Sequence, residues 1–353
     1  MGICIDARMI NHSGIGTYIR TLLTPVKNLE CFSVILPEGF DEEGCKDLNP
    51  IFSKAPIYSF YEQLDILRKV VNVKHSLLHI PHYNIPILYK GRMLVTVHDL
   101  IHFKFPQLLP NKAALIYSGF MFRHICNKVE KIIAVSQNTK RDLMEMLDIP
   151  ECKIQVIYNG LTKRRYDEAD SDSMAGTLKK FGIFKMYLLY VGNVRSHKNI
   201  ERLFQAFKII KDKNYDIQLV ITGAVKESYN SQTPEDVIFT GYVNNEDLNC
   251  LYCGAEIFVF PSLYEGFGYP PLEAMQHDVP VVCSNSSSLP EVVGDAALMF
   301  DPYDIEDMAN KIINVMTDNT LKDSLKIKGR EQIKKFDIVE FEKQMTSLYR
   351  SML

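Results

Sequence analysis

The sequence lacks any long hydrophobic run. Hydrophobic residues make up 46% of the 353 residues, yet no apolar stretch approaches the roughly 20 residues that a membrane-spanning helix needs. The opening segment, MGICIDARMI, predicts a short strand interrupted by Asp6 and Arg8, without the basic start and longer apolar core of a signal peptide. We therefore expect a cytoplasmic protein whose closest association with lipid is peripheral, at the inner face of the membrane.

The sequence also lacks an excess of charge and a set of paired cysteines. Forty basic and 43 acidic residues leave a net charge of −3, which gives no overall attraction to nucleic acid, and no nucleic-acid partner is expected. Of the eight cysteines, only Cys250 and Cys253 form a C-x-x-C pair, and no second Cys or His pair lies at zinc spacing. Single thiols in a reducing compartment are the simpler interpretation.

Short apolar runs alternate with longer amphipathic stretches along the whole chain. This alternation predicts an α/β fold with parallel sheets, because parallel strands need a crossover between them. The predicted strands of the first half are Gly2–Asp6, Phe32–Leu36, Leu77–Ile80, Met93–His98, Lys131–Ser136 and Ile154–Tyr158. Those of the second half are Met186–Val191, Ile217–Thr222, Val237–Phe239, Ile257–Phe260, Val279–Cys283 and Leu298–Phe300. The halves therefore repeat one architecture without repeating a sequence.

A polar segment separates the two series. The run TKRRYDEADSDSMAG, residues 162–176, has few apolar side chains to bury, and we interpret it as an interdomain linker. It predicts an N-terminal domain over 1–165, a C-terminal domain over 166–337, and a final helix over 338–353 that returns to the N-terminal domain. Doubly wound sheets bind ligands at the carboxyl ends of their strands, so a cleft between two such domains is the expected site.

The segment FVFPSLYEGFGYPPLEAM, residues 258–275, carries the clearest chemical pattern. An apolar strand ends at Pro261, a glycine-containing loop follows, and Pro270-Pro271 opens a helix that bears Glu273 in its first turn. Free amides at a helix start suit a diphosphate, and Glu265 and Glu273 can accept hydrogen bonds from sugar and ribose hydroxyls. A structural interpretation stays open at this point, with Glu273 offsetting the helix dipole and Glu265 solvated.

Glu265 and Glu273, with seven residues between them in E-G-F-G-x-P-P-x-E-A-M, resemble the signature of glycosyltransferase family 4. Members of this family are retaining enzymes of the GT-B fold, with two facing Rossmann-like domains and a cleft between them. The resemblance implies that the C-terminal domain binds the donor and the N-terminal domain binds the acceptor. It implies that Glu273 holds the donor ribose and Glu265 the donor sugar. The amides around Phe267 and Gly268 would then face the sugar and the diphosphate.

The segment YVGNVRSHKNI, residues 190–200, is a second candidate. A buried strand ends at Gly192, and Asn199 is positioned to cap the helix that follows the loop. Arg195 and Lys198 in the loop would neutralise phosphate charge beside that helix start, although an ordinary solvated loop is the alternative.

The family places a basic Arg-to-Lys pair in this loop. Lys198 matches the lysine, whereas Asn193 stands directly after Gly192, where the family's arginine commonly stands. The resemblance therefore implies donor contacts from Gly192, Asn193 and Lys198, with Arg195 replacing that arginine from another direction.

Two segments of the first half are candidates for the same cleft. Gly14 and Gly16 allow a tight turn into a helix, but Ile19 replaces the third glycine of a dinucleotide fingerprint, so nicotinamide binding is not expected. His98 ends a predicted strand, and Asp99 is positioned to orient its ring; a structural histidine bonded to the local backbone is the alternative. Gly16 and His98 match a family glycine turn under the sugar-diphosphate and a family histidine near the reacting sugar.

Three further segments complete the pattern. Gly241-Tyr242-Val243 resembles the family's base-recognition segment, so the backbone of Val243 is expected to bond the nucleobase. Asp170-Ser171-Asp172 has the D-x-D form of a metal site in another glycosyltransferase fold, but it lies in the polar linker, and no metal is expected. Residues 112–133 predict a core helix with a basic exposed edge; contact with an anionic membrane that carries a lipid-linked acceptor is the alternative.

Together these patterns predict a retaining hexosyltransferase that needs no metal or other cofactor. It would transfer a hexose from a nucleoside diphosphate sugar to a hydroxyl of a growing glycan or a lipid-linked saccharide. His98, Glu265, Lys198 and Arg195 are expected at the reaction centre. GDP-mannose is the favoured donor, because the G-F-G-x-P-P-L-E-A-M wording resembles mannosyl- and rhamnosyltransferases of bacterial surface polysaccharides, and UDP-sugars stay open. The alternatives are a sugar-nucleotide epimerase or a phosphorylase on the same scaffold, or a non-catalytic sugar-nucleotide-binding subunit.

Overall fold

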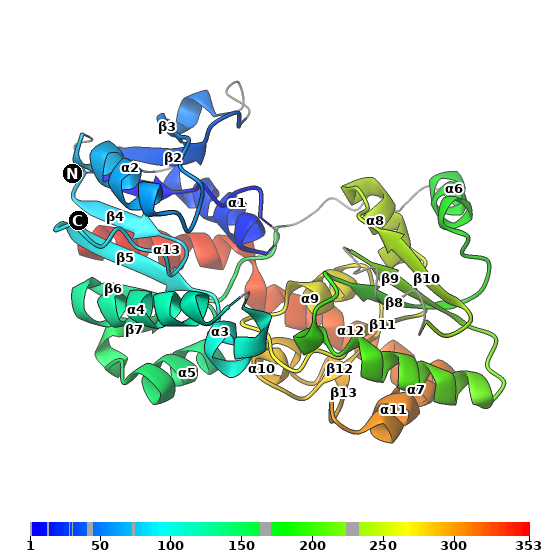
Figure 1. The fold of residues 1–353 in the computed structure, drawn as a ribbon. Helices are drawn as coiled ribbons and strands as arrows, with labels where there is room; N and C mark the ends of the chain where they lie inside the picture. Colours follow the sequence, from blue (N-terminus) through cyan, green and yellow to red (C-terminus); the bar gives the residue numbers. More distant parts are fainter. Residues whose placement is uncertain are drawn as a thin grey trace. The chain divides into compact units, whose positions relative to one another are not determined.

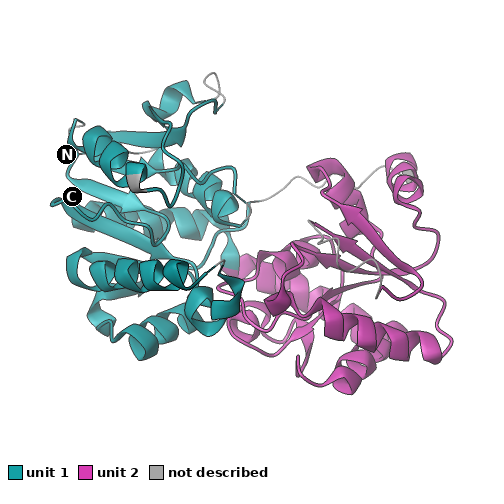
Figure 2. Ribbon diagram, in the orientation of Figure 1, with its two compact units in different colours: residues 1–163, 336–353 teal, residues 164–335 magenta. Residues whose placement is uncertain are grey.

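The chain divides into two compact units (Figure 2). Unit 1 comprises residues 1–163 and 336–353, and unit 2 comprises residues 164–335. The structure is a computed structural model that describes residues 2–353 except 13, 28, 30, 41–44, 73–74, 110, 163–170 and 224–232. Each unit has its own parallel sheet.

Unit 1 contains a sheet of seven strands in the order β3-β2-β1-β4-β5-β6-β7 (Figure 1). The strands are β1 (Ile3–Asp6), β2 (Phe32–Pro37), β3 (Pro50–Ser53), β4 (Leu77–Ile80), β5 (Arg92–Val97), β6 (Lys131–Ala134) and β7 (Ile154–Val156). They are rich in Ile, Val and Leu, as strands covered on both faces are. Ile5 lies opposite Val34 on one side and His79 on the other, so β1, β2 and β4 end along the same edge.

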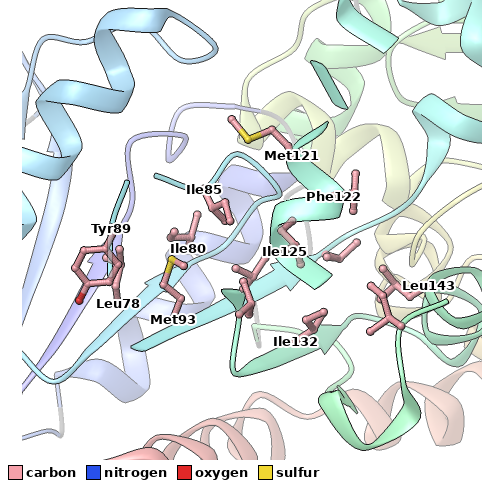
Figure 3. Close-up of a cluster of buried hydrophobic side chains, with 14 of the residues drawn as sticks. Leu78, Ile80, Ile85, Tyr89, Met93, Met121, Phe122, Ile125, Ile132 and Leu143 are labelled. Carbon is pink, nitrogen blue, oxygen red and sulfur yellow. The ribbon is translucent and has the colours of Figure 1, made fainter. Parts of the chain in front are cut away.

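Helices cover both faces of this sheet. They are α1 (Ile15–Val26), α2 (Phe60–Val71), α3 (Ile101–Lys104), α4 (Lys112–Lys128), α5 (Gln137–Leu147) and α13 (Ile338–Met352). On one face, α2, α4 and α5 pack on strand residues such as Leu78 and Ile80 to form a hydrophobic core (Figure 3). His79 and Thr96 point to the opposite face, because strand side chains alternate. On that face α13 packs against α1, and Tyr349 of α13 hydrogen-bonds His79.

Unit 2 contains a sheet of six strands in the order β10-β9-β8-β11-β12-β13. The strands are β8 (Tyr187–Val191), β9 (Gln218–Thr222), β10 (Val237–Gly241), β11 (Ile257–Phe260), β12 (Val281–Ser284) and β13 (Ala297–Phe300). The helices are α6 (Ser171–Phe181), α7 (Ile200–Asp212), α8 (Asn245–Cys253), α9 (Tyr269–Gln276), α10 (Leu289–Val293), α11 (Ile305–Thr317) and α12 (Asn319–Gln332). α7 packs against α11, α9 against α12, and α6 against α8.

Both sheets have the strand order of a doubly wound, Rossmann-like fold, which confirms the predicted fold class. The order reverses between β1 and β4 in unit 1 and between β8 and β11 in unit 2. At such a switch point the loops after the two strands leave in opposite directions, and ligands bind between them. The candidate loops 192–199 and 261–268 follow β8 and β11, so both lie at the switch point of unit 2.

Two segments differ from the sequence-based prediction. No strand is predicted at Pro50–Ser53, where the short strand β3 forms the sheet edge; a proline at the first position of an edge strand is tolerated but hides the strand pattern. Residues 171–176, predicted as linker, form the first turns of α6. The hydroxyl of Thr177 in this helix donates to Asp247 of α8 over 3.2 Å. Asp172 is exposed on α6, and Asp170 lies outside the described residues.

Gly223 provides a test of how the loops after β8 and β9 fit together. Its φ is +115°, and a Cβ there would lie 2.4 Å from the carbonyl oxygen of Gly192. We expect Gly223→Ala to destabilise unit 2 by about 2–5 kcal/mol, because backbone strain and a backbone clash add. Gly176→Ala in α6 is the control, since its Cβ meets nothing within 4 Å; it should stabilise by about 0.5–1 kcal/mol. Urea unfolding measures the stability of both variants. Equal stabilities would contradict the close contact between Gly223 and the carbonyl oxygen of Gly192.

Candidate functional site

An ion pair joins the two loops at the switch point of unit 2. Nζ of Lys198, after β8, lies 2.5 Å from Oε1 of Glu265, after β11, and the two side chains are 17% and 14% exposed. The ammonium group also lies 5.5 Å from the centre of the Phe260 ring. The N–H of Leu263 donates to the carbonyl oxygen of His197 over 2.8 Å, which ties the loops through their backbones. One positive and one negative group are thus held side by side at the carboxyl edge of the sheet.

A run of serines after β12 holds the loop that bears Glu265. Oγ of Ser288 lies 3.0 and 2.8 Å from the carbonyl oxygens of Glu265 and Phe267. The N–H of Glu265 donates to Oγ of Ser287 over 2.8 Å, and Ser286 bonds two carbonyl groups at the start of the loop. The sequence prediction missed this support, although the S-N-S-S-S run of small hydroxyl side chains after a strand was a visible signal.

Helix α9 begins at Tyr269, just before the Pro270-Pro271 pair at which its start was predicted, and this changes the position of Glu273. Gly268 takes the left-handed conformation with φ +104° at the N-cap, so the helix begins at Tyr269, with proline in the first turn. The expectation that Glu273 lies in the first turn is therefore wrong, since it lies in the second. Oε2 of Glu273 accepts a hydrogen bond from the Tyr252 hydroxyl over 3.1 Å, and the Tyr252 ring stacks on His277 at 4.8 Å. Tyr252 thereby orients the Glu273 carboxylate.

The loop after β8 contains the other predicted donor contacts. Gly192 has φ +146°, and Asn193 and Arg195 are both exposed. Asn199 occupies the N-cap position of α7, but its side chain makes no capping hydrogen bond, and that expectation is wrong. Its φ is +61°, and the side-chain amide instead donates to two loop carbonyls, including that of Pro261 over 3.1 Å. Asn199 therefore joins the two switch-point loops.

The segment predicted to recognise a base follows the edge strand β10. The carbonyl oxygen of Gly241 accepts from the N–H of Gly223 over 2.8 Å. Val243 is half-buried and follows Tyr242, which is 92% exposed. Asn244 then caps α8. Val243 thus lies just beyond the same carboxyl edge of the unit 2 sheet.

In unit 1, His98 directly follows β5. Its Nε2 donates to the carbonyl oxygen of Pro81 over 2.9 Å, so the neutral ring carries its proton there and presents Nδ1 as an acceptor. The Tyr18 ring packs edge-on against it, with the ring centres 4.9 Å apart. Burial lowers the pKa of His98, with the charge of Asp99 acting in the opposite direction. The Asp99 carboxylate, predicted to orient this ring, accepts a hydrogen bond from the N–H of Ile101 over 3.0 Å.

Gly16 is the second residue of α1 and allows a close approach of the chain to itself. A Cβ at this position would lie 2.4 Å from the carbonyl oxygen of Ile10, in the turn after β1. Any larger residue would push α1 away from that turn. Gly16 therefore has a packing role of its own.

Asp6 and Arg8, which interrupt the first strand pattern, form a buried ion cluster. Arg8 donates to Asp6 over 2.8 and 2.6 Å and to Glu62 over 2.6 Å. Asn84 donates to the other Glu62 oxygen over 2.6 Å. Burial alone raises the pKa of Asp6, but the adjacent Arg8 guanidinium holds that pKa well below its usual range. The cluster fixes the loops after β1 and β4 and the start of α2 at the switch point of unit 1.

The described residues contain neither a candidate metal site nor a candidate membrane-spanning helix. No cluster of three or more His, Cys, Asp or Glu side chains in the described ranges is placed to hold a metal ion. Within the same part of the chain, no helix combines the length and apolar character that crossing a membrane requires.

Two Rossmann-like units in one chain, with polar loops gathered at the carboxyl edges of their sheets, define a GT-B architecture. Residues 13–165 match the family described as "Glycosyltransferase Family 4", and residues 179–332 match the family described as "Glycosyl transferases group 1". The chain therefore belongs to the glycosyltransferases that combine these two domains, one in each half of the chain. It is therefore a glycosyltransferase, as its loops and strand order suggest.

Similar proteins support the same assignment. The O-antigen chain mannosyltransferase B of Escherichia coli is 30% identical over 287 residues, which cover 78% of this chain and 74% of the relative. The O-antigen chain mannosyltransferase RfbU of Salmonella typhimurium is 29% identical over 266 residues, which cover 73% of this chain and 69% of the relative. The crystal structure of Anabaena HepE in complex with UDP-glucose shares the fold, with a TM-score of 0.79 and 16% identity over 99% of this chain and 100% of that chain.

Two buried histidines predict that stability depends on pH. Burial lowers the pKa of His79 and of His197 to about 3, whereas an unfolded chain titrates its histidines near about 6.5. As the pH falls below about 6.5, the unfolded state binds protons that the folded state does not, so stability falls by up to about 1.4 kcal/mol per pH unit for each histidine. Urea unfolding of wild type and His197→Asn between about pH 7.5 and about pH 4.5 measures this dependence. The free energy of unfolding of His197→Asn should fall less steeply with decreasing pH than that of the wild type. Identical slopes would contradict the lowered pKa of His197.

Proposed function

We propose that the chain is a retaining hexosyltransferase that transfers a hexose from a nucleoside diphosphate sugar to a hydroxyl acceptor. The acceptor is a growing glycan or a lipid-linked saccharide. The observation that carries the proposal is the contact between Lys198 and Glu265 at the switch point of unit 2, where doubly wound sheets bind their ligands.

The leaving diphosphate gains negative charge in the transition state, and preorganised positive groups at that point lower the barrier. Pro270 and Pro271 lie in the first turn of α9 and have no backbone N–H that could donate to a diphosphate. The amides available there are therefore those of Gly268 and Tyr269, which makes the ammonium group of Lys198 the main cationic partner. Arg195, exposed in the same loop, is the second cation.

The sugar side of the reaction belongs to Glu265 and His98 in this proposal. Glu265 accepts hydrogen bonds from hydroxyls of the donor sugar. Nδ1 of His98 accepts one from a hydroxyl of the reacting sugar, because Nε2 is already committed to Pro81. The bond from the anomeric carbon to the diphosphate oxygen breaks, and the bond to the acceptor oxygen forms on the same face. The acceptor proton passes to the departing phosphate oxygen, and no covalent enzyme intermediate is needed.

The relatives named as mannosyltransferases support GDP-mannose as the donor. Unit 2 would bind it, with Val243 at the base, Glu273 at the ribose, and Gly192, Asn193, Phe267 and Gly268 along the diphosphate and sugar. Gly16 of unit 1 would lie under the sugar-diphosphate, and unit 1 would bind the acceptor.

An exposed stripe on α4 supports a membrane-bound acceptor. Ile116 and Phe120 are 73% and 46% exposed, and Lys112 and Arg123 are exposed beside them. Apolar and basic side chains on one helix face suit the surface of an anionic membrane. We propose that the enzyme works at the inner face of the membrane, and co-sedimentation with anionic vesicles tests this contact.

Donor binding tests the proposed function directly. In a thermal-shift panel of GDP-, UDP- and ADP-sugars, GDP-mannose should stabilise the protein most, by about 2.7 kcal/mol at about 100 times its dissociation constant. By calorimetry, Glu273→Ala should weaken donor binding by about 1–3 kcal/mol, because the ribose loses its half-buried carboxylate partner. Glu306→Ala, at an exposed position of α11, is the control and should bind normally. Equal affinity of both variants would reject the ribose contact.

Turnover tests the role of Lys198. Lys198→Met should lower kcat by about 10²–10³-fold, the usual cost of losing one preorganised charge partner, while EDTA leaves the wild type active. Lys322→Met is the matched control, because Lys322 pairs with Glu256 at the amino end of β11 with similarly low exposure. It should lose comparable stability and keep its turnover. Loss of activity in EDTA, restored by manganese or magnesium, would refute metal independence.

A further inference from the structure

A buried series of hydrogen bonds crosses unit 1 from the C-terminal helix to α1. The hydroxyl of Tyr349 in α13 lies 2.7 Å from Nδ1 of His79 in β4. Nε2 of His79 lies 2.9 Å from Oγ1 of Thr96 in β5, and that oxygen lies 3.0 Å from the Tyr18 hydroxyl in α1. The Tyr18 ring in turn contacts His98 edge-on. The last helix of the chain is thus connected to the candidate reaction centre.

All four linking side chains, Tyr18, His79, Thr96 and Tyr349, are completely buried. Buried polar groups are costly unless every one is hydrogen-bonded, and apolar side chains would hold α13 in place without this cost. Because burial lowers the pKa of His79 to about 3, its ring stays neutral, with one nitrogen donating and the other accepting. Hydroxyl groups on either side can serve both roles, so the series stays intact at neutral pH.

The Tyr18 ring is where this series meets His98. Its hydroxyl bonds Thr96 in β5, and its ring packs on His98, which lies two residues further along the chain, directly after β5. α13 also reaches the same ring directly, since Phe341 packs edge-on against Tyr18 at 5.9 Å. The position of the Tyr18 ring is therefore set by α13 at two points, once through Phe341 and once through Tyr349.

We propose that Tyr349 is a positioning residue that sets the orientation of His98. It acts through His79, Thr96 and Tyr18, and the proposal rests on the proposed function of His98 at the reacting sugar. Without the Tyr349 hydroxyl, His79 loses one of its two partners, the hydroxyl groups beyond it rearrange, and the Tyr18 ring no longer presses on His98. All these residues belong to unit 1, so the base, ribose and diphosphate contacts proposed for unit 2 are retained. The change at His98 is therefore expected in kcat rather than in the donor KM.

The test compares Tyr349→Phe with Tyr187→Phe. Tyr187 is equally buried in unit 2, and its hydroxyl donates to the carbonyl oxygen of Leu251 over 2.8 Å. Each variant loses one buried hydroxyl hydrogen bond, so both should lose similar stability in urea. Tyr349→Phe should lower kcat about tenfold at an unchanged donor KM, since even about 1 Å of misplacement can cost about 10²-fold. Tyr187→Phe should keep the wild-type kcat.

The pKa of His98, followed by NMR and assigned with His98→Gln, gives a readout that does not need activity. Among the described residues, the titratable groups placed around His98 are Tyr18, His79, His82 and Asp99, and none of them is replaced in either variant. In Tyr349→Phe the Tyr18 ring no longer covers the His98 ring, so the pKa of His98 should rise towards its ordinary value.

The proposal is overturned if the pKa of His98 is the same in both variants, or if Tyr187→Phe loses as much turnover as Tyr349→Phe. If the wild type transfers no sugar but the pKa of His98 rises in Tyr349→Phe alone, the positioning role stands and the proposed function fails.

Discussion

At the switch point of unit 2, two loops that leave the sheet in opposite directions have to be held together, and the Lys198–Glu265 ion pair holds them. The serines after β12 fix the carboxylate side, and Asn199 fixes the lysine side. In the proposed reaction the two groups have different roles: the ammonium group of Lys198 faces the diphosphate, and the carboxylate of Glu265 faces the sugar.

The switch point of unit 1 uses charge differently. The Asp6–Arg8–Glu62 cluster is almost completely buried, whereas Lys198 and Glu265 keep part of their surface exposed. Removing one member of a buried cluster leaves an uncompensated charge, which costs several kcal/mol, so the cluster is suited to fixing loops rather than to meeting ligands. The same fold thus supports a structural charge cluster in one unit and a chemically available pair in the other.

The sequence predicted most of the fold because buried parallel strands are continuous apolar runs, and most predicted strands agree with the structure within two residues. It did not predict β3, a four-residue edge strand that begins with Pro50, because proline is unfavourable in most strand positions. At the site, the E-G-F-G-x-P-P pattern located Glu265 and Gly268 on their loop. The second-turn position of Glu273, the side-chain partners of Asn199 and the serine contacts depend on tertiary packing, which no local pattern encodes.

Whether Lys198 and Glu265 act jointly on the donor is measured by a double-mutant cycle on kcat with Lys198→Met, Glu265→Gln and the variant carrying both. If the two charges act as one unit at the donor, the double variant should lose little more turnover than the worse single variant, because residues that act together are strongly non-additive. Losses that multiply independently would contradict the account, since the ion pair would then hold the loops without acting jointly on the donor.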